Sequence, residues 1–339
     1  MNKENKNTTI KFILMALVLV FLIVLMTCVG KYEISASESL SILFRAITMQ
    51  TQVADEMAVN VVLKLRLPRI LMSIIVGAAL SMSGACYQGV FQNPLVSPDF
   101  LGVSSGACIG AAIAILFGGS RALISILAFL GGIVAVTITM FIPSLVKNKS
   151  NIVLVLSGII VGSLMSSILG FIKYVADPQT QLASITYWTM GAFSYASLED
   201  LIPILIICIP PAVILIAVSW WIDVLSMGEN EAKTLGANTI LIRTISIICS
   251  TMLTSAAICF AGTIGWVGLL IPHFARMLVG SSNRKVLPFS CILGGIFMLL
   301  VDTITRVIGV TEMPVSIMTG IVGAPFFCYL LYKKRNEIS

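Results

Sequence analysis

Two arginines, Arg66 and Arg69, flank a Leu-Pro pair at the start of a long apolar stretch. An arginine side chain carries a rigid fork of N–H donors that pairs with a carboxylate, so it suits docking to an acidic partner. Pro68 suits the first turn of a helix, where its N–H is not needed. The same two arginines would also suit an interfacial anchor, with their charged ends extended out of the apolar layer. These residues alone therefore leave docking and anchoring open.

A second polar segment, residues 222–238, interrupts the apolar sequence and carries Glu229 and Glu231. Residues 229–235 have the pattern of a short amphipathic helix that ends at Gly236. A short helix held between two glycines is suited to transmit movement between the membrane domain and a peripheral partner. The alternative is a helix that lies on the bilayer, which the carboxylates disfavour because anionic lipid would repel them.

The chain contains no nucleotide-hydrolysing motif. Its nearest approach to a phosphate-binding loop, residues 228–234, lacks the glycine before the lysine and carries two carboxylates that would repel phosphate. We therefore expect this chain not to be an enzyme and to hold no cofactor. If ATP drives the protein, a partner ATPase binds the ATP and Mg²⁺.

Ionisable residues are scarce within the apolar stretches, although a carrier driven by an ion gradient usually needs them near mid-membrane. Asp302 and Arg306 are the nearest candidates, and their four-residue spacing predicts a local ion pair on one helix face. The only histidine, His273, has no second histidine to share a metal, and the eight cysteines are scattered through apolar stretches. We expect no metal site, and we expect the energy source to lie outside the chain.

The composition shows what must position these residues. Of the 339 residues, 58% are hydrophobic and 11% are charged, whereas a soluble domain carries about 25% charged residues. The surroundings must be mostly lipid, in which only helices or a closed barrel satisfy the backbone. The apolar stretches are continuous over roughly 20 residues, which fits spanning helices and not the alternation of barrel strands. Nucleic-acid binding is excluded because no basic face of a soluble domain can form.

We predict an all-α integral membrane protein with one transmembrane domain over residues 1–339. About ten membrane-spanning helices are expected, near 12–29, 67–88, 101–117, 122–143, 152–173, 200–220, 239–260, 263–280, 286–305 and 315–332. The bias of Lys and Arg toward alternate loops places both termini, the segment 1–11 and the loop 222–238 in the cytoplasm. The first stretch could instead be a signal peptide, but it is long for a signal core and lacks a good cleavage site.

Glycines recur at four-residue spacing within two of these stretches, at Gly102, Gly106 and Gly110 and at Gly158 and Gly162. This spacing puts them on one helix face, where small residues allow neighbouring backbones to approach closely. Tight helix packing is the favoured interpretation, and a glycine-lined substrate path is the alternative.

Several motifs occur in a fixed order along nearly the whole chain, from about residue 12 to residue 332. They are Arg66-Leu-Pro-Arg69, Val76-Gly-Ala-Ala-Leu80, Ser83-Gly-Ala85, Gln92-Asn-Pro-Leu95, Ser97-Pro-Asp99, Leu101-Gly-Val-Ser-Ser-Gly-Ala107, Gly262 to His273 with Ala275-Arg276, Asp302 to Arg306, Glu312-Met-Pro-Val315 and Gly323-Ala-Pro325. This succession resembles the permease family of iron–siderophore, haem and vitamin B12 ABC importers, the FecCD-like transmembrane subunits.

The resemblance implies a permease of ten helices in the bacterial inner (cytoplasmic) membrane. A second permease subunit, identical or homologous, two ATP-binding cassette ATPase subunits, an extracellular substrate-binding protein and membrane lipid are its implied partners. Arg66, Arg69 and Arg306 match the arginines that receive carboxylates of the binding protein. The matched ATPase-coupling element comprises Met227, Gly228, Glu229, Glu231, Ala232, Leu235 and Gly236.

The cytoplasmic gate of the family falls at Ser150 and Asn151, where the asparagine departs from the small hydroxyl residues that the family often carries. The implied function is binding-protein-dependent import of an iron–siderophore, haem or cobalamin by alternating access. A secondary transporter driven by an ion gradient is the alternative, and a scaffold or receptor without transport is a third class.

Overall fold

The computed structural model of this chain describes residues 3–48, 55–146, 151–308 and 312–333. The regular structure of these residues is helical throughout, which confirms the all-α prediction. In chain order the elements are α1 (Lys3–Cys28), α2 (Ala36–Ile47), α3 (Glu56–Val59), the π-helix η1 (Asn60–Arg66), α4 (Leu67–Val90), the 3-10 helix η2 (Pro98–Leu101), α5 (Val103–Leu116), α6 (Arg121–Leu145), α7 (Asn151–Val175), α8 (Gln181–Met190), α9 (Leu198–Leu225), α10 (Glu229–Thr234), α11 (Thr239–Ala261), α12 (Val267–Val279), α13 (Asn283–Ile308) and α14 (Val315–Lys333).

Each predicted span coincides with an apolar helix, but the helices differ in length. Within the described ranges, seven helical segments are long and apolar enough to cross a membrane. The apolar helices α5, α12 and α14 are shorter. Two of these, α5 and α12, follow turns at which the chain reverses, with Gly102 at φ +81° and Gly262 at φ +72°. Glycine has no Cβ and adopts a positive φ without steric cost, which explains glycine at both turns.

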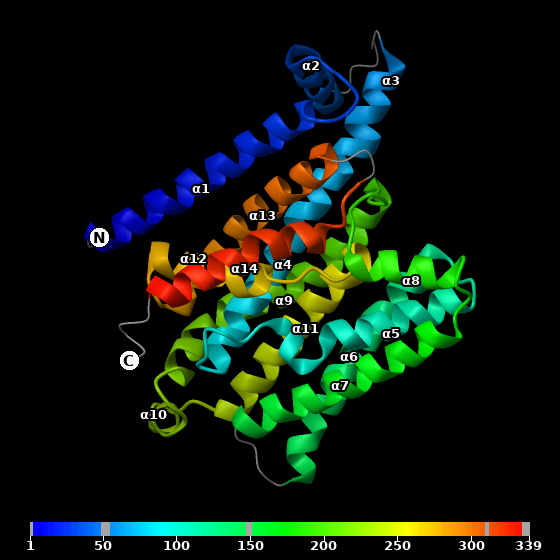
Figure 1. Cartoon of the computed structure of the whole chain (residues 1–339). Helices are drawn as coiled ribbons and strands as arrows, with labels where there is room; N and C mark the ends of the chain where they lie inside the picture. Colours follow the sequence, from blue (N-terminus) through cyan, green and yellow to red (C-terminus); the bar gives the residue numbers. More distant parts are fainter. Residues whose placement is uncertain (1–2, 49–54, 147–150, 309–311, 334–339) are drawn as a thin grey trace.

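The pair α4 and α13 lies at the centre of the bundle, and α1 lies along its outside (Figure 1). The segment Glu56–Val90, which contains α4, is 78% buried within its most apolar window, whereas Lys6–Cys28 of α1 is only 6% buried. At mid-length α4 and α13 touch backbone to backbone, because a Cβ added at Gly77 would collide with the Gly294 carbonyl. Small residues allow this approach, which maximises dispersion contacts between the helices.

Three of the five glycines singled out in the sequence, Gly106, Gly110 and Gly158, serve the same purpose. A Cβ on Gly106 would meet the backbone of Gly131 in α6, and a Cβ on Gly158 would meet the Phe100 carbonyl. The packing interpretation is therefore confirmed for these positions.

Two further helices, α2 and α8, lie between the predicted spans. The amphipathic α2 has a serine N-cap, since the Ser35 side chain accepts a hydrogen bond from the Glu38 N–H. The second, α8, precedes the turn at Gly191. Both are too short to give an apolar run that would reveal them.

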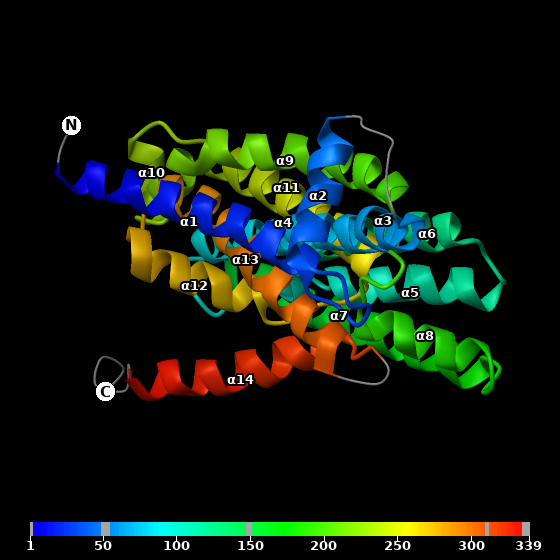
Figure 2. The same ribbon diagram turned by 90° about the horizontal axis from the view of Figure 1, so that it is seen from above.

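The bundle has two distinct ends. In both views the start of α1, the end of α14 and the short helix α10 lie together at one end, which is the left end in Figure 2. The helices α3 and α8 lie toward the other end. We call the first the α10 end and the second the opposite end.

The contact at Gly77 can be tested by adding one methyl group. Gly77→Ala forces α4 and α13 apart and should lower the free energy of unfolding by about 1–3 kcal/mol. Gly170→Ala in α7 is the matched control, because nothing lies within 4 Å of its added Cβ. Unfolding in detergent should show a loss for the first variant only, and equal stability of the two variants would contradict the packing described.

Candidate functional site

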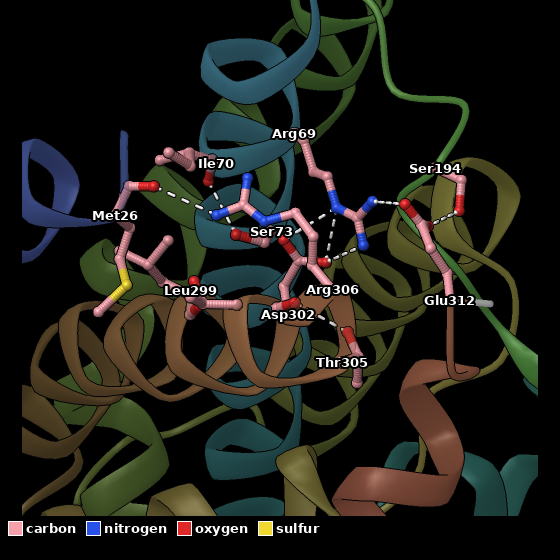
Figure 3. Close-up of polar contacts among 11 residues, drawn as sticks. Met26, Arg69, Ile70, Ser73, Ser194, Leu299, Asp302, Thr305, Arg306 and Glu312 are labelled. Atoms are coloured by element: carbon pink, nitrogen blue, oxygen red, sulfur yellow. Dashed lines mark hydrogen bonds and ion pairs between the residues drawn. The ribbon is translucent and has the colours of Figure 1, made fainter. Parts of the chain in front are cut away.

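The arginines predicted from the sequence lie toward the opposite end of the bundle, where η1 leads into α4 and where α13 ends. Figure 3 shows two of them, Arg69 and Arg306. We use the name arginine cluster for Arg66, Arg69, Arg306, Asp302 and Glu312. Within it Arg69, from the first turn of α4, lies between two carboxylates. Its Nη2 is 2.8 Å from Asp302 Oδ1, and its Nη1 is 2.8 Å from Glu312 Oε1. Arg69 therefore joins α4 to α13 and to the segment before α14.

The local ion pair predicted between Asp302 and Arg306 is wrong. The fully buried Asp302 carboxylate accepts hydrogen bonds from Arg69 Nε at 2.9 and 3.0 Å. The Arg306 side chain points away, toward α1, and its Nη2 donates to the Met26 carbonyl at 3.2 Å (Figure 3). A bidentate guanidinium from a neighbouring helix compensates the buried carboxylate better than a single contact along its own helix would.

Two of these arginines donate hydrogen bonds to the free backbone carbonyls at the end of α1. The last carbonyls of a helix have no partner within it and carry partial negative charge. Arg66 Nη1 donates to the Thr27 carbonyl at 2.8 Å, and its Nη2 donates to the Tyr32 carbonyl at 2.5 Å. Together with the Arg306 contact, these bonds fasten the end of a helix that is otherwise exposed to lipid.

The arginines are buried, with exposed fractions of 4% for Arg66, 7% for Arg69 and 8% for Arg306. These side chains do not act as interfacial anchors that extend out of the apolar layer, because each guanidinium donates hydrogen bonds to other residues of this chain. Within the described residues, Nε and Nη1 of Arg306 have no hydrogen-bond partner. Buried donors without a partner carry a desolvation cost, which makes Arg306 the least satisfied arginine of the cluster.

Glu312 is the accessible member of the arginine cluster, with 39% of its side chain exposed. Partial burial alone would raise its pKa, but hydrogen bonds from Ser194 and the charge of Arg69 outweigh this and lower the pKa of the carboxyl. Glu312 also borders a recess of about 700 Å³ between α8 and α14. The other lining residues are Pro178, Leu182, Ala183, Thr186, Tyr187, Met190, Met313, Pro314 and Ile317.

The short helix predicted within residues 222–238 is present as α10. Both flanking glycines are left-handed, with φ +130° at Gly228 and +80° at Gly236. The apolar side chains of Met227 and Leu235 are 70% and 57% exposed, whereas Ala232 is buried. An exposed apolar pair that flanks a short helix at one end of a membrane bundle is a suitable contact for a peripheral protein.

The carboxylates of α10 contact residues of α10 itself or of its immediate neighbours. Glu229 lies 3.1 Å from Lys233 and 3.5 Å from Arg243 of α11. The hydrogen bond from Lys233 and the two positive charges lower the pKa of the Glu229 carboxyl. The Glu231 carboxylate folds back over Gly228, where an added Cβ would collide with it.

The sequence analysis named Gln92 and Arg276 within motifs but did not group them with other polar side chains at the α10 end. We call this group the inner polar cluster. It comprises Gln88, Gln92, Asp223, Arg276 and Asn283. Arg276 donates to the Gln88 side chain, and Gln92 Nε2 donates to the Leu225 carbonyl at 2.7 Å. These residues come from four helices far apart in sequence, so no local pattern could reveal them.

The predicted gate lies largely beyond what the structure describes. Ser150 is outside the described residues, and Asn151 is seen only as the first backbone position of α7. Its role as a gate residue stays a prediction.

Residues 17–333 match the FecCD transport family. The chain belongs to this family. It is 36% identical over 322 residues to the molybdate import system permease protein MolB of Haemophilus influenzae, with 95% of each chain covered. It is 33% identical to the hemin transport system permease protein HmuU of Yersinia pestis, covering 95% of this chain and 97% of the relative.

The fold of this FecCD permease also matches a solved structure, an inward-facing ABC transporter of metal-chelate type. The TM-score is 0.84 at 35% identity, and the match covers 94% of this chain and 97% of that one. The family resemblance drawn from the motifs is confirmed, and the protein is an ABC transporter permease.

The pair at the centre of the arginine cluster makes a sharp stability prediction for the FecCD permease. Arg69→Ala leaves Asp302 buried without its cation and should lower the free energy of unfolding by about 3–5 kcal/mol. Arg121→Ala breaks the more exposed Arg121–Asp200 pair, which has a similar 2.7 Å separation, and should cost less than about 1 kcal/mol. Unfolding in detergent measures both, and equal losses would contradict the stabilising role of the buried pair.

Proposed function

We propose that this FecCD permease imports an iron–siderophore, haem or cobalamin by alternating access, powered by a separate ATPase. In this proposal the chain crosses the inner membrane of a bacterium ten times, with α5, α12 and α14 as shortened crossings. The α10 end faces the cytoplasm, together with both termini. The chain itself performs no bond chemistry.

The observation that carries the proposal is the separation of two partner surfaces to opposite ends of one membrane bundle. The arginine cluster has three cations and two carboxylates, so it keeps an excess positive charge for an acidic binding protein. The α10 end presents Met227 and Leu235 to an ATPase subunit. A second permease subunit completes the path, with lipid around both.

The recess beside Glu312 favours an organic chelate over a small oxyanion as cargo. Its volume of about 700 Å³ lies in the usual range for sites that take drug-sized ligands. Its lining is mostly apolar and contains no lysine or arginine, and its one carboxylate, Glu312, is already paired with Arg69. An oxyanion such as molybdate would therefore find no cation of its own in the recess. The name of the relative MolB makes molybdate the cargo to compare.

Uptake into proteoliposomes tests the function. The permease is reconstituted with its ATPase subunits and binding protein, and radiolabelled iron siderophore, haemin, cobalamin and molybdate are each offered. Uptake of a chelate should require internal ATP and should survive ionophores that collapse ion gradients. Uptake that continues without ATP and stops with ionophores would instead show a secondary transporter.

Arg306→Gln tests the docking surface in the same vesicles. Glutamine can still donate to the Met26 carbonyl but loses the charge and the unpartnered donors. The half-saturating concentration of binding protein should rise about tenfold or more, as expected when a buried charge pair is lost. Arg121→Gln, an arginine outside the cluster, should change it less than about twofold. An unchanged value for an assembled Arg306→Gln complex would contradict docking at the arginine cluster.

A further inference from the structure

The last turn of α9, immediately before α10, carries a carboxylate that reaches another helix. Asp223 Oδ2 accepts a hydrogen bond from the Ser282 hydroxyl at 2.7 Å, and its Oδ1 accepts one from the Asn283 N–H at 2.5 Å. Asn283 is the first residue of α13. Asp223 therefore caps the N-terminus of α13, where free N–H groups and the helix dipole favour a negative charge.

This cap is built into a buried contact. The Asn283 side chain is 3% exposed. A Cβ added to Gly89 would lie 2.7 Å from Ile222 and 2.9 Å from Asn283 Oδ1, so the ends of α4, α9 and α13 meet without a gap. Gln92 adds a second tie between α4 and α9 through the Leu225 carbonyl. A displacement of this end of α9 must therefore move α13 as well.

The far end of α13 carries the arginine cluster. From Ser282 to Asp302 the chain rises 20 residues along one helix, which is about 30 Å. At that end Asp302 bonds to Arg69, and at mid-length Gly77 and Gly294 hold α4 against α13. Close-packed helices transmit a displacement because their interior has little free space to absorb it.

The other flank of α10 is different. Asn238 accepts a hydrogen bond from the Leu241 N–H at 3.1 Å, so it caps the helix that it precedes, α11. Both caps lie beside α10, but only Asp223 bridges from its own helix to a different one.

We propose that Asp223 is the positioning residue that links α10 to α13, so that docking at the arginine cluster is transmitted along α13 to the ATPase. This inference rests on the proposed function, and it adds a specific route between the two partner surfaces. Because Asp223 acts through α13, its removal should weaken communication and not docking.

The test compares helix-cap variants in the complete complex, with ATP hydrolysis measured with and without the binding protein. In Asp223→Ala basal hydrolysis should stay within about twofold of the unaltered protein, while stimulation by the binding protein falls about tenfold, as loss of hydrogen bonds to a charged group predicts. Ser282→Ala removes one of the two bonds and should give an intermediate loss. Asn238→Ala is the matched control and should keep its stimulation.

A second readout separates communication from a merely structural role. Ile304, 40% exposed on α13 near Asp302, is replaced by cysteine in an otherwise cysteine-free permease. Its maleimide labelling rate should change with ATP in the parent and in Asn238→Ala, should change less in Ser282→Ala, and should no longer change in Asp223→Ala.

Two results for Asp223→Ala would overturn the inference. One is normal stimulation of ATP hydrolysis by the binding protein. The other is a loss of that stimulation while the labelling rate at position 304 still changes with ATP as in the parent. If Asp223→Ala fails to assemble, Ser282→Ala decides by the same two criteria. A parent complex that is not stimulated by binding protein would instead contradict the proposed function, so the two failures are distinguishable.

Discussion

The buried pair of Arg69 and Asp302 is the interaction on which the rest of this structure depends. It places an ion pair inside an apolar bundle, where each charge alone would be expensive and only a bidentate partner makes the carboxylate tolerable. Through that pair α4 and α13 are joined at one end, and the contact of Gly77 with Gly294 joins them at mid-length. These two helices form the centre around which the lipid-facing helices pack.

The remaining functional features are attached to this pair of helices. The arginine cluster lies where α4 begins and α13 ends, which is the upper end of this helix pair in Figure 1. Arg66 and Arg306 also donate hydrogen bonds to carbonyls in the last turn of α1. At the α10 end, Asp223 and Asn283 attach the segment that precedes α10. A permease that serves two soluble partners on opposite sides of a membrane needs a stiff connection between them, and α4 with α13 supplies one.

The sequence predicted the helices well because lipid imposes a simple rule: an apolar stretch of sufficient length becomes a helix. It also predicted α10, because the glycines that end a short helix leave a local signal. It did not predict that Asp302 pairs with Arg69 instead of Arg306, since that choice depends on how two distant helices pack. Asp223 was missed for the same reason, because its partners lie about 60 residues further along the chain.

The most direct test of this account is whether α4 and α13 move as one body. Nitroxide labels at two exposed positions near the arginine cluster, Leu65 and Ile304, report the distance between these helices by pulsed electron paramagnetic resonance. The account predicts that the distance distribution keeps the same maximum with and without ATP and binding protein, while labels at Leu235 and Ile159 change their separation. A shift between Leu65 and Ile304 during the ATP cycle would contradict it.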